Sequence, residues 1–506
     1  MTHLLRRLIP ALLVAAFCWS GTASAAAPRP VVDGNRILDQ STSKRLIPRG
    51  VNFPGFEYAC QQGWAYGEQG TAASQAASTA AGIASWKINT VRLPLNEGCW
   101  LGEGGLPAGA LTATGYRNAV EGFVDALNQA GIMVILDLHW TVPDDLPGDG
   151  LRPMPDSHSP AFWTSVATRF KTNRSVIFDL FNEPHSRWNS NGTQVFDLSW
   201  SCWANGGCQA PIEPDTAATS GGAFYTATGM KSLVQAVRAT GAGQPILLSG
   251  IDYANDLRGW LANSPADGQL IAGFHNYPGQ RCHTTACWNS EIAPVAARVP
   301  VLAAEFGQND CVTPPSHVVR FMTWADEHQI GYLAWAWWVL PELGCSNYAL
   351  VSDLDGTPLG PVGKELHDHL AELARQPEGP DPQDPDPDNA GRPVTGPKEV
   401  LTVRRRPARL KIRRAAFRRG RLDLRVAVSP LASFPVEVKV RLASTRRTMK
   451  AKISADSGIG RLTRAVPAGK RPTVVIATYP GDQRLRPQTV KTRFSVSSLT
   501  RNRPSG

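Results

Sequence analysis

Tryptophan is missing from the C-terminal part of this chain. The 506-residue sequence contains fifteen tryptophans, and all of them lie at or before Trp338. Charge divides the chain in the same way. Residues 392–506 hold 29 Lys and Arg against 5 Asp and Glu, whereas the remainder holds 23 against 37. An acidic, tryptophan-rich part and a basic, tryptophan-free part predict at least two domains, as the length also does.

Three further absences narrow the class of protein. No glycine-rich dinucleotide fingerprint follows any predicted strand, which disfavours an open, doubly wound sheet. No stretch beyond the N-terminal region is apolar for long enough to cross a membrane, and no anchoring signal ends the chain. The cysteine spacings do not match paired zinc ligands, so no metal site is expected.

Residues 1–27 are typical of a secretory signal peptide. Arg6 and Arg7 precede an apolar run from Leu8 to Trp19, and small residues follow at 23–25. The run is short for a membrane anchor, which is the alternative. We therefore expect a secreted, extracellular protein.

Cysteine usage agrees with an oxidising compartment. Of nine cysteines, Cys18 lies in the signal peptide, and the remaining eight can form four disulfides. Local spacing predicts two short loop disulfides, and the remaining cysteines would then tie loops that follow neighbouring strands. The expected pairs are Cys202–Cys208, Cys282–Cys287, Cys60–Cys99 and Cys311–Cys345.

Strand and helix patterns alternate over residues 28–375, after a hairpin expected at 31–47. This alternation predicts an α/β fold, a (β/α)8 TIM barrel, with the open doubly wound sheet as the alternative. The expected strands are 46–52, 89–95, 132–139, 176–181, 245–250, 270–275, 299–306 and 330–338, and the clearest helices are 72–87, 114–130, 160–171, 226–240 and 364–375.

The rest of the chain is predicted as a linker, a small domain and a tail. Residues 376–397 contain three Asp-Pro pairs, which stiffen and extend a linker. Apolar and polar residues alternate over 398–497, as in the segment 421–426, so we expect a small antiparallel β-sandwich. Residues 498–506 are expected to be disordered.

One apolar run ends in Asn182-Glu183-Pro184. Proline stops the strand, and the carboxylate at its end is either an ordinary turn acid or part of a site at the mouth of the barrel. The other strand ends favour a site, because active groups of such barrels gather at the C-terminal ends of their strands. Those ends carry Asn52, Arg92, His139, His275, Tyr277, Glu305, Trp335 and Trp337.

Two of the strand-end residues, Glu183 and Glu305, are glutamates. Glu305 is the sole charge on an apolar strand, which is costly unless the charge has a partner or a task. Paired carboxylates are what glycosidic cleavage requires, because one donates a proton to the leaving oxygen and the other attacks the anomeric carbon or activates water. We therefore predict that both are catalytic.

Short motifs surround the strand-end residues along the chain. They are Gly50-Val51-Asn52, Val91-Arg92-Leu93-Pro94-Leu95, Asp137-Leu138-His139, Asn182-Glu183-Pro184, His275-Asn276-Tyr277, Glu305-Phe306-Gly307 and Gly331-Tyr332-Leu333-Ala334-Trp335. Taken in order, these motifs resemble glycoside hydrolase family 5, the cellulase-type group of retaining β-glycosidases, over about residues 31–375. The resemblance implies that Glu183 is the acid/base and Glu305 the nucleophile, without a cofactor or a metal.

Supporting roles are expected for the remaining strand-end residues. Asn182 can bond a sugar 2-hydroxyl, and Arg92 and Tyr277 can steady the nucleophile. His139 and His275 are expected to line the subsite at the cleavage point, with Trp335 as a stacking face. A structural histidine and a packing ion pair at the arginine are the alternatives. Three tryptophans and two histidines are left open. Trp337 could point into the core, and Trp140 and Trp338 could be core or sugar-binding residues. The loop residues His158 and His185 are unassigned.

The most favoured activity is an endo-β-1,4-glucanase (cellulase) acting as a monomer on a β-linked polysaccharide. A β-mannanase or another β-glucan or β-glycoside hydrolase is the alternative, and a non-catalytic carbohydrate-binding protein is a distant one. Elaborate loops follow strands 1, 2 and 4, and the last of them, residues 182–222, contains Trp188, Trp200 and Trp203. These loops leave the precise substrate, and endo or exo action, undecided.

Residues 398–497 have no tryptophan platform for sugar binding, and some of their four aromatic residues are needed for their own core. Runs of arginine such as 404–406 favour an anionic partner, namely a cell-wall polymer, an acidic polysaccharide or a membrane surface. Nucleic acid is not expected for an exported protein. A basic, solvated spacer is the alternative.

Overall fold

The computed structural model describes residues 26–376, apart from 59, 62–74, 108–109, 214–222 and 340–344, together with strands between residues 406 and 493. Residues 1–25 of the predicted signal peptide, the linker from residue 377 onward and the C-terminal tail therefore lie outside the described residues. Contacts divide the chain into two units, Met1–Asp381 and Pro382–Gly506. Among the described residues, no helix combines the length and apolar character needed to cross a bilayer.

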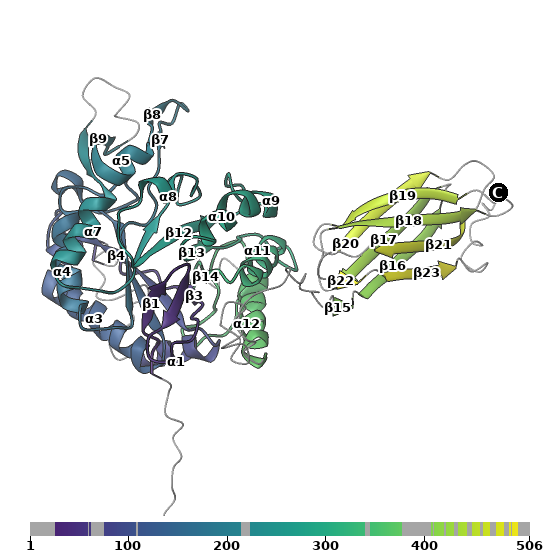
Figure 1. Ribbon diagram of the computed structural model, residues 1–506, viewed down its shortest axis with the longest axis horizontal. Coiled ribbons are helices and arrows are strands. Elements are labelled where there is room, and N and C mark those ends of the chain that lie inside the picture. Colours follow the sequence, from purple (N-terminus) through teal and green to yellow (C-terminus); the bar gives the residue numbers. More distant parts are fainter. Residues whose placement is uncertain are drawn as a thin grey trace, which may run out of the picture. The chain divides into compact units, whose positions relative to one another are not determined.

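Eight parallel strands close into a barrel at the centre of the first unit (Figure 1). The strands follow one another in chain order, and the last pairs with the first. The predicted (β/α)8 fold is thus confirmed. The strands are β3 (Arg49–Asn52), β4 (Thr90–Asn96), β5 (Met133–Trp140), β6 (Val176–Asp179), β11 (Ile246–Ser249), β12 (Leu270–Asn276), β13 (Val301–Phe306) and β14 (Gly331–Ala334).

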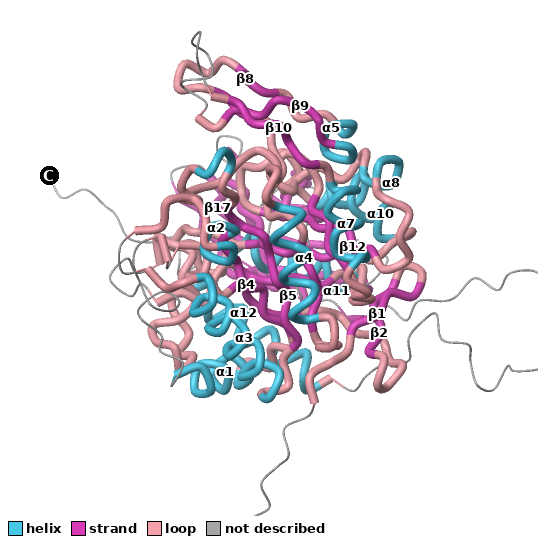
Figure 2. The backbone as a smooth tube through the Cα atoms, turned by 90° about the vertical axis from the view of Figure 1, so that its left-hand side faces the viewer, coloured by secondary structure: helices cyan, strands magenta, loops and turns pink. Residues whose placement is uncertain are grey.

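Helices surround the barrel (Figure 2), and the longer ones bury one face against it. The helix α3, for example, begins at the Thr112 cap and buries Tyr116, Val120, Phe123 and Leu127, which recur at helical spacing. The helices are α1 (Ala76–Ser85), α2 (Glu97–Leu101), α3 (Ala113–Gln129), α4 (Ser159–Phe170), α7 (Met230–Ala239), α8 (Trp260–Asn263), α9 (Thr285–Cys287), α10 (Ala293–Ala296), α11 (Ser316–Glu327) and α12 (Gly360–Arg375).

Apolar side chains fill the inside of the barrel. The hairpin of β1 (Pro30–Asp33) and β2 (Arg36–Asp39) adds Ile37 to this cluster and so covers the N-terminal ends of the strands. The filled interior leaves the C-terminal ends of the strands as the place for a site. The inner side chains are Met133, Ile135, Ile177, Leu247, Ile271, Leu302, Ala304 and Leu333.

The segment expected as one long loop after strand 4 has secondary structure of its own. β7 (Arg187–Trp188) pairs with β8 (Gln194–Phe196), and after α5 (Trp200–Asn205), β9 (Gly206–Pro211) pairs with β10 (Phe224–Thr228). The predicted start of a helix at residue 226 was wrong, because Thr226 pairs with Gln209 in β10 and the helix begins only at Met230. In Figure 2 these strands stand out from one end of the barrel.

All four expected disulfides are present in the structure: Cys60–Cys99, Cys202–Cys208, Cys282–Cys287 and Cys311–Cys345. The first joins the loop after β3 to α2, and the fourth joins the segments that follow β13 and β14. The loops at the C-terminal face are therefore tied together covalently.

The described strands of the second unit pair in antiparallel fashion, as predicted for a sandwich, apart from one short parallel pair. One sheet has the order β16-β17-β20 and the other β19-β18-β21-β23, and a short pair is formed by β15 and β22. These strands are β15 (Arg406–Pro407), β16 (Arg409–Arg418), β17 (Arg421–Ser429), β18 (Phe434–Leu442), β19 (Thr448–Ala455), β20 (Ile459–Ala465), β21 (Pro472–Tyr479), β22 (Leu485–Arg486) and β23 (Gln488–Arg493).

Candidate active site

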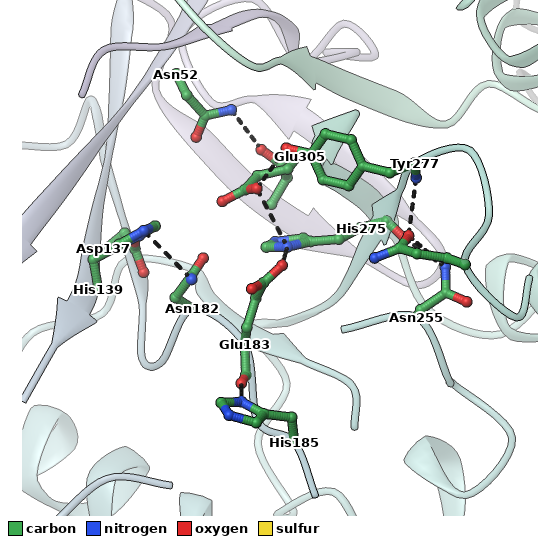
Figure 3. Close-up of polar contacts among 12 residues, drawn as sticks. Asn52, Asp137, His139, Asn182, Glu183, His185, Asn255, His275, Tyr277 and Glu305 are labelled. Atoms are coloured by element: carbon green, nitrogen blue, oxygen red, sulfur yellow. Dashed lines mark hydrogen bonds and ion pairs between the residues drawn. The ribbon is translucent and has the colours of Figure 1, made fainter. Parts of the chain in front are cut away.

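The predicted site residues meet at the C-terminal mouth of the barrel, where Figure 3 shows most of them directed toward one another. All but Arg92 lie at or just after the end of their strand, because parallel strands of a barrel end on the same face. The expected strand-end position of Arg92 was wrong, because Arg92 lies within β4 (Thr90–Asn96) and its long side chain reaches the other residues from below. The structure brings together all eight, namely Arg92, His139, Asn182, Glu183, His275, Tyr277, Glu305 and Trp335.

Arg92 on β4 is the centre of the hydrogen-bond network below the mouth. Its side chain is fully buried. Burial alone would lower the pKa of Arg92, but Asp137, Asp179 and Glu305 outweigh it and raise the pKa, so the guanidinium stays charged. It contacts Asp179 Oδ2 at 2.8 Å, Asn182 Oδ1 at 2.8 Å, Glu305 Oε1 at 2.9 Å, Asn52 Oδ1 at 3.0 Å and Asp137 Oδ2 at 3.0 Å.

Glu305 on β13 is held by a donor on each oxygen. Arg92 Nη1 donates to Oε1 at 2.9 Å, and the Tyr277 hydroxyl donates to Oε2 at 2.7 Å. Burial, and then the negative charge of Glu305, raises the pKa of Tyr277 well above its usual value, so the phenol remains a donor. The carboxylate is thus fixed in one orientation, which is what a group that must attack a single atom requires.

Glu183, just beyond β6, has a different environment. Its Oε1 lies 2.9 Å from Nδ1 of His275, and its side chain is 12% exposed. Burial raises the pKa of Glu183 to about 7, against the opposing effects of His139 and Arg92. The carboxyl can therefore exchange a proton near neutral pH, as an acid/base group must.

His275 lies between the two glutamates (Figure 3). Its Nδ1 is 2.9 Å from Glu183 and 3.7 Å from Oε2 of Glu305. Burial lowers the pKa of His275 to about 3, so the ring is neutral. Nδ1 and one oxygen of each glutamate all lie within 4.8 Å of one another. Carboxyl groups of retaining glycosidases stand about 5–5.5 Å apart, so this separation fits that class better than the wider spacing of inverting enzymes.

A second chain of contacts orients Asn182. Its Oδ1 accepts from Arg92, which turns Nδ2 toward Nε2 of His139, 3.5 Å away. Asp137 Oδ2 lies 2.6 Å from Nδ1 of His139. Burial, and then Arg92, lowers the pKa of His139 to about 4, so the neutral ring donates from Nδ1 to Asp137 and leaves Nε2 as an acceptor. Asn182 is thereby fixed, with one amide hydrogen directed to His139 and the second left for a ligand.

Trp335 stacks on His139 with ring centroids 5.7 Å apart and an interplanar angle of 13°. It is partly exposed, so one apolar face remains for a ligand. Trp337, in contrast, is 1% exposed and packs edge-on against Trp86, which places it in the core. Trp140 and Trp338 are partly exposed.

Sequence reasoning gave no role to two acids of the site, Asp137 and Asp179. Each is the only charge on an apolar part of its strand, which is the same signal that singled out Glu305. Burial raises the pKa of Asp137 to about 7, against the opposing effect of Arg92. Both carboxylates hold the buried guanidinium in position.

The two unassigned histidines make different contacts. His185 is buried, with Nδ1 2.6 Å from the Glu183 carbonyl oxygen. His158 contacts Asp156 at 3.2 Å and Asp145 at 3.3 Å, and the hydrogen bond to Asp156 raises its pKa to about 8. The first supports the backbone of Glu183, and the second ties loops together.

Comparison with known proteins defines the class as glycoside hydrolase. Residues 46–340 match the model of the cellulase family, glycosyl hydrolase family 5. The match spans more than half of the chain, so the chain belongs to this family, and the predicted resemblance is confirmed.

Individual relatives are distant. Over 232 residues the chain is 23% identical to endoglucanase CelA of Streptomyces lividans, which covers 44% of this chain and 41% of that protein. The chain therefore aligns with less than half of the length of this curated relative. The crystal structure of β-glucanase SdGluc5_26A from Saccharophagus degradans has a TM-score of 0.51 at 19% identity, covering 69% of this chain and 95% of that one. A structure of the same enzyme in complex with cellotetraose gives the same values. These likenesses show the shared fold.

Proposed function

We propose that this family 5 glycoside hydrolase is a secreted endo-β-1,4-glucanase that works by double displacement. The observation that carries the proposal is the pairing of two unlike glutamates. Glu305 is held by Arg92 and Tyr277, whereas the pKa of Glu183 is raised to about 7, and one oxygen of each glutamate lies within 4.8 Å of the other. One carboxylate is arranged to attack, and the other to donate and accept a proton.

In the first step, an oxygen of Glu305 bonds to the anomeric carbon while the glycosidic C–O bond breaks. Glu183 gives its proton to the leaving oxygen, so the leaving sugar departs neutral. Asn182 can donate to the 2-hydroxyl of the sugar, and Trp335 can stack on its ring. Positive charge that develops on the sugar ring faces the carboxylate of Glu305.

In the second step, Glu183 removes a proton from water, which attacks the same carbon. The bond to Glu305 breaks, the carboxylate is regenerated, and the anomeric configuration is retained overall. The neutral His275 beside Glu183 can hold either protonation state of that carboxyl by a hydrogen bond.

Two substitutions test the catalytic roles. Glu183→Gln and Glu305→Gln keep the shape of each side chain, and each should lower kcat on a soluble β-glucan by at least about 10³-fold. Leu261→Ala, at a 44% exposed position on α8, serves as the control. An inert wild type, or two glutamine variants as active as the wild type, would contradict the enzymatic assignment.

The substrate is tested by a product profile on cellulose derivatives, mixed-linkage β-glucan, β-mannan and xyloglucan. Release of cello-oligosaccharides of several lengths from the middle of β-1,4-glucan chains supports the proposal. Faster cleavage of mannan, or release of one product from chain ends only, would contradict it. Support for secretion comes from the N-terminal pattern of residues 1–27 and the four disulfides.

For the basic C-terminal unit we propose electrostatic contact with an anionic cell-wall polymer. The support is its charge, 29 Lys and Arg against 5 Asp and Glu over residues 392–506. The full chain should be retained on cell walls at low salt and released at high salt, and a chain ending at residue 381 should be retained less. Retention that high salt does not change would contradict the electrostatic contact.

A further inference from the structure

A pair of buried acids lies outside the active site, near the starts of α2 and α4. Glu97 is the first residue of α2, and Asp156 precedes α4 by three positions. Both acids are buried, with Glu97 0% and Asp156 1% exposed. One ligand atom each of Glu97, Asp156 and His158 lie within 4.8 Å of one another. Two buried carboxyl groups this close cannot both be ionised unless a positive charge lies beside them.

One oxygen of each acid is held by a backbone amide, and the other is not. The Val142 amide donates to Oε2 of Glu97 at 3.0 Å, and the His158 amide donates to Oδ1 of Asp156 at 2.7 Å. Oε1 of Glu97 and Oδ2 of Asp156 are buried, and neither has a hydrogen-bond partner among the described residues. The same holds for the buried hydroxyl of Thr141, next to Val142. Buried acceptors without a partner are costly, so these oxygens point to a bound group.

Positive charge is scarce around the pair. Within the part of the chain that the structure describes, the ionic partner of these acids is His158, whose Nδ1 lies 3.2 Å from Oδ1 of Asp156. That oxygen already accepts from the His158 amide. Nε2 of the same ring faces two more exposed acids, Asp145 at 3.3 Å and Glu103 at 3.8 Å. One imidazole thus stands among four carboxyl groups, and a further cation would stabilise the cluster.

The pair joins segments that are far apart in the sequence. Glu97 follows β4 directly, and Asp156 lies in the long segment that leads from β5 to α4. In that segment the Pro153 carbonyl oxygen accepts from the amide of His185 at 3.1 Å, so it also supports the backbone just beyond Glu183. A group bound by both acids would therefore tie together the loops that follow β4 and β5.

We propose that Glu97 and Asp156 bind one Ca²⁺ ion, which stabilises this face of the barrel. Calcium takes carboxylate oxygens at about 2.3–2.6 Å, so two oxygens on one ion stand at most about 5 Å apart. The separation within 4.8 Å satisfies this limit. The unpaired atoms are oxygens, which favours a hard cation over a transition metal. Mg²⁺ demands a strict octahedral geometry and gives up water reluctantly, which disfavours it at a buried pair.

Thermal unfolding of the full chain tests the site. Tryptophan fluorescence follows the barrel unit alone, because all fifteen tryptophans lie at or before Trp338. Protein treated with EDTA and dialysed is unfolded without metal, with Ca²⁺ and with Mg²⁺, each at about 10 mM, roughly 100 times the Kd of a weak extracellular calcium site. Ca²⁺ should raise the Tm by about 3 °C, and Mg²⁺ by less than half as much. Equilibrium dialysis should find one Ca²⁺ bound per chain.

Variants locate the ion. Glu97→Gln and Asp156→Asn keep the size of each side chain and remove its charge, and each should lose the rise in Tm that Ca²⁺ causes. Each variant is compared with itself with and without Ca²⁺, so a lower Tm without metal does not obscure the result. Asp368→Asn is the matched control, because this acid on α12 is 55% exposed, and it should keep the rise. A wild type that shows no rise and binds no Ca²⁺ would overturn the site and indicate a shared proton. A rise that persists in both Glu97→Gln and Asp156→Asn would also overturn it.

Discussion

The hydroxyl of Tyr277 donates a 2.7 Å hydrogen bond to Oε2 of Glu305. Arg92 holds the other oxygen, so the two donors together fix the plane of the carboxylate. Gly307 packs closely against the Tyr277 ring, because a Cβ added to Gly307 would lie 3.1 Å from that ring and 3.0 Å from the ring of Tyr348. The phenol is therefore a positioning group for the proposed nucleophile.

Removing only that hydroxyl should impair the chemical step. Tyr277→Phe leaves Oε2 of Glu305 without its donor, and kcat should fall roughly ten- to a hundredfold while KM changes little. Steady-state kinetics on a soluble β-glucan measure this change. Tyr348→Phe is the matched control, because Tyr348 packs edge-on against Tyr277 at 5.4 Å. Equal kcat in Tyr277→Phe and the wild type would contradict the positioning role.

The activity should have an alkaline limb near neutral pH. Burial raises the pKa of Glu183 to about 7, and the acid must be protonated to assist the leaving group. The kcat/KM for β-glucan should therefore fall as pH rises through about 7. An aryl glycoside with a good leaving group needs no acid. With this substrate, kcat/KM of Glu183→Gln should no longer fall as pH rises through about 7. A fall that remains in the variant would assign this pH dependence to another group.

The same burial predicts a pH-dependent effect on stability. The pKa of Glu183 is higher in the folded chain than its ordinary value of 4.5, so the folded state binds the proton more tightly. This contribution to stability is present at low pH and is lost as pH rises through about 7. Glu183→Gln carries no titrating group at this position. The free energy of unfolding of the variant minus that of the wild type should therefore be about 2 kcal/mol larger at pH 8 than at pH 5. Denaturant unfolding of both proteins at both pH values measures this change. A difference between variant and wild type that is the same at pH 5 and pH 8 would contradict the prediction.

The disulfides should differ in their effect on stability. Cys60–Cys99 closes a loop between cysteines 39 positions apart, whereas the cysteines of Cys282–Cys287 are only 5 positions apart. Chain entropy predicts a loss of about 4 kcal/mol when the first is removed and about 2 kcal/mol for the second. Thermal unfolding of Cys60→Ser/Cys99→Ser and Cys282→Ser/Cys287→Ser compares them. A larger loss for the second pair would show that loop length does not control the effect.

The barrel and the main site residues could be predicted from sequence because the fold places strand ends together. Glu183 and Glu305 are 122 positions apart, yet each ends an apolar strand, and parallel strands of a closed barrel end on one face. The same rule located His139 and His275. A one-dimensional pattern thus specified a three-dimensional cluster.

What could not be predicted depends on tertiary contacts. Trp335 and Trp337 are two positions apart, but one stacks on His139 at the mouth and the other packs against Trp86. The segment after β6 forms two strand pairs whose partners are short, so no local periodicity revealed them. Residues 252–254 have positive φ angles, and this backbone conformation is likewise fixed by hydrogen bonds to Pro184 and His275, which are distant in sequence.

The central claim is that Glu305 attacks the sugar and Glu183 handles the proton. The most direct measurement is mass spectrometry of the enzyme after reaction with a 2-deoxy-2-fluoro cellobioside that carries an activated leaving group. The leaving group lets the glycosyl-enzyme form, and the fluorine slows its hydrolysis. We predict one added disaccharide per chain, located by peptide mapping on Glu305. A label on Glu183 or on another residue, or no label on an enzyme that cleaves β-glucan, would contradict the account.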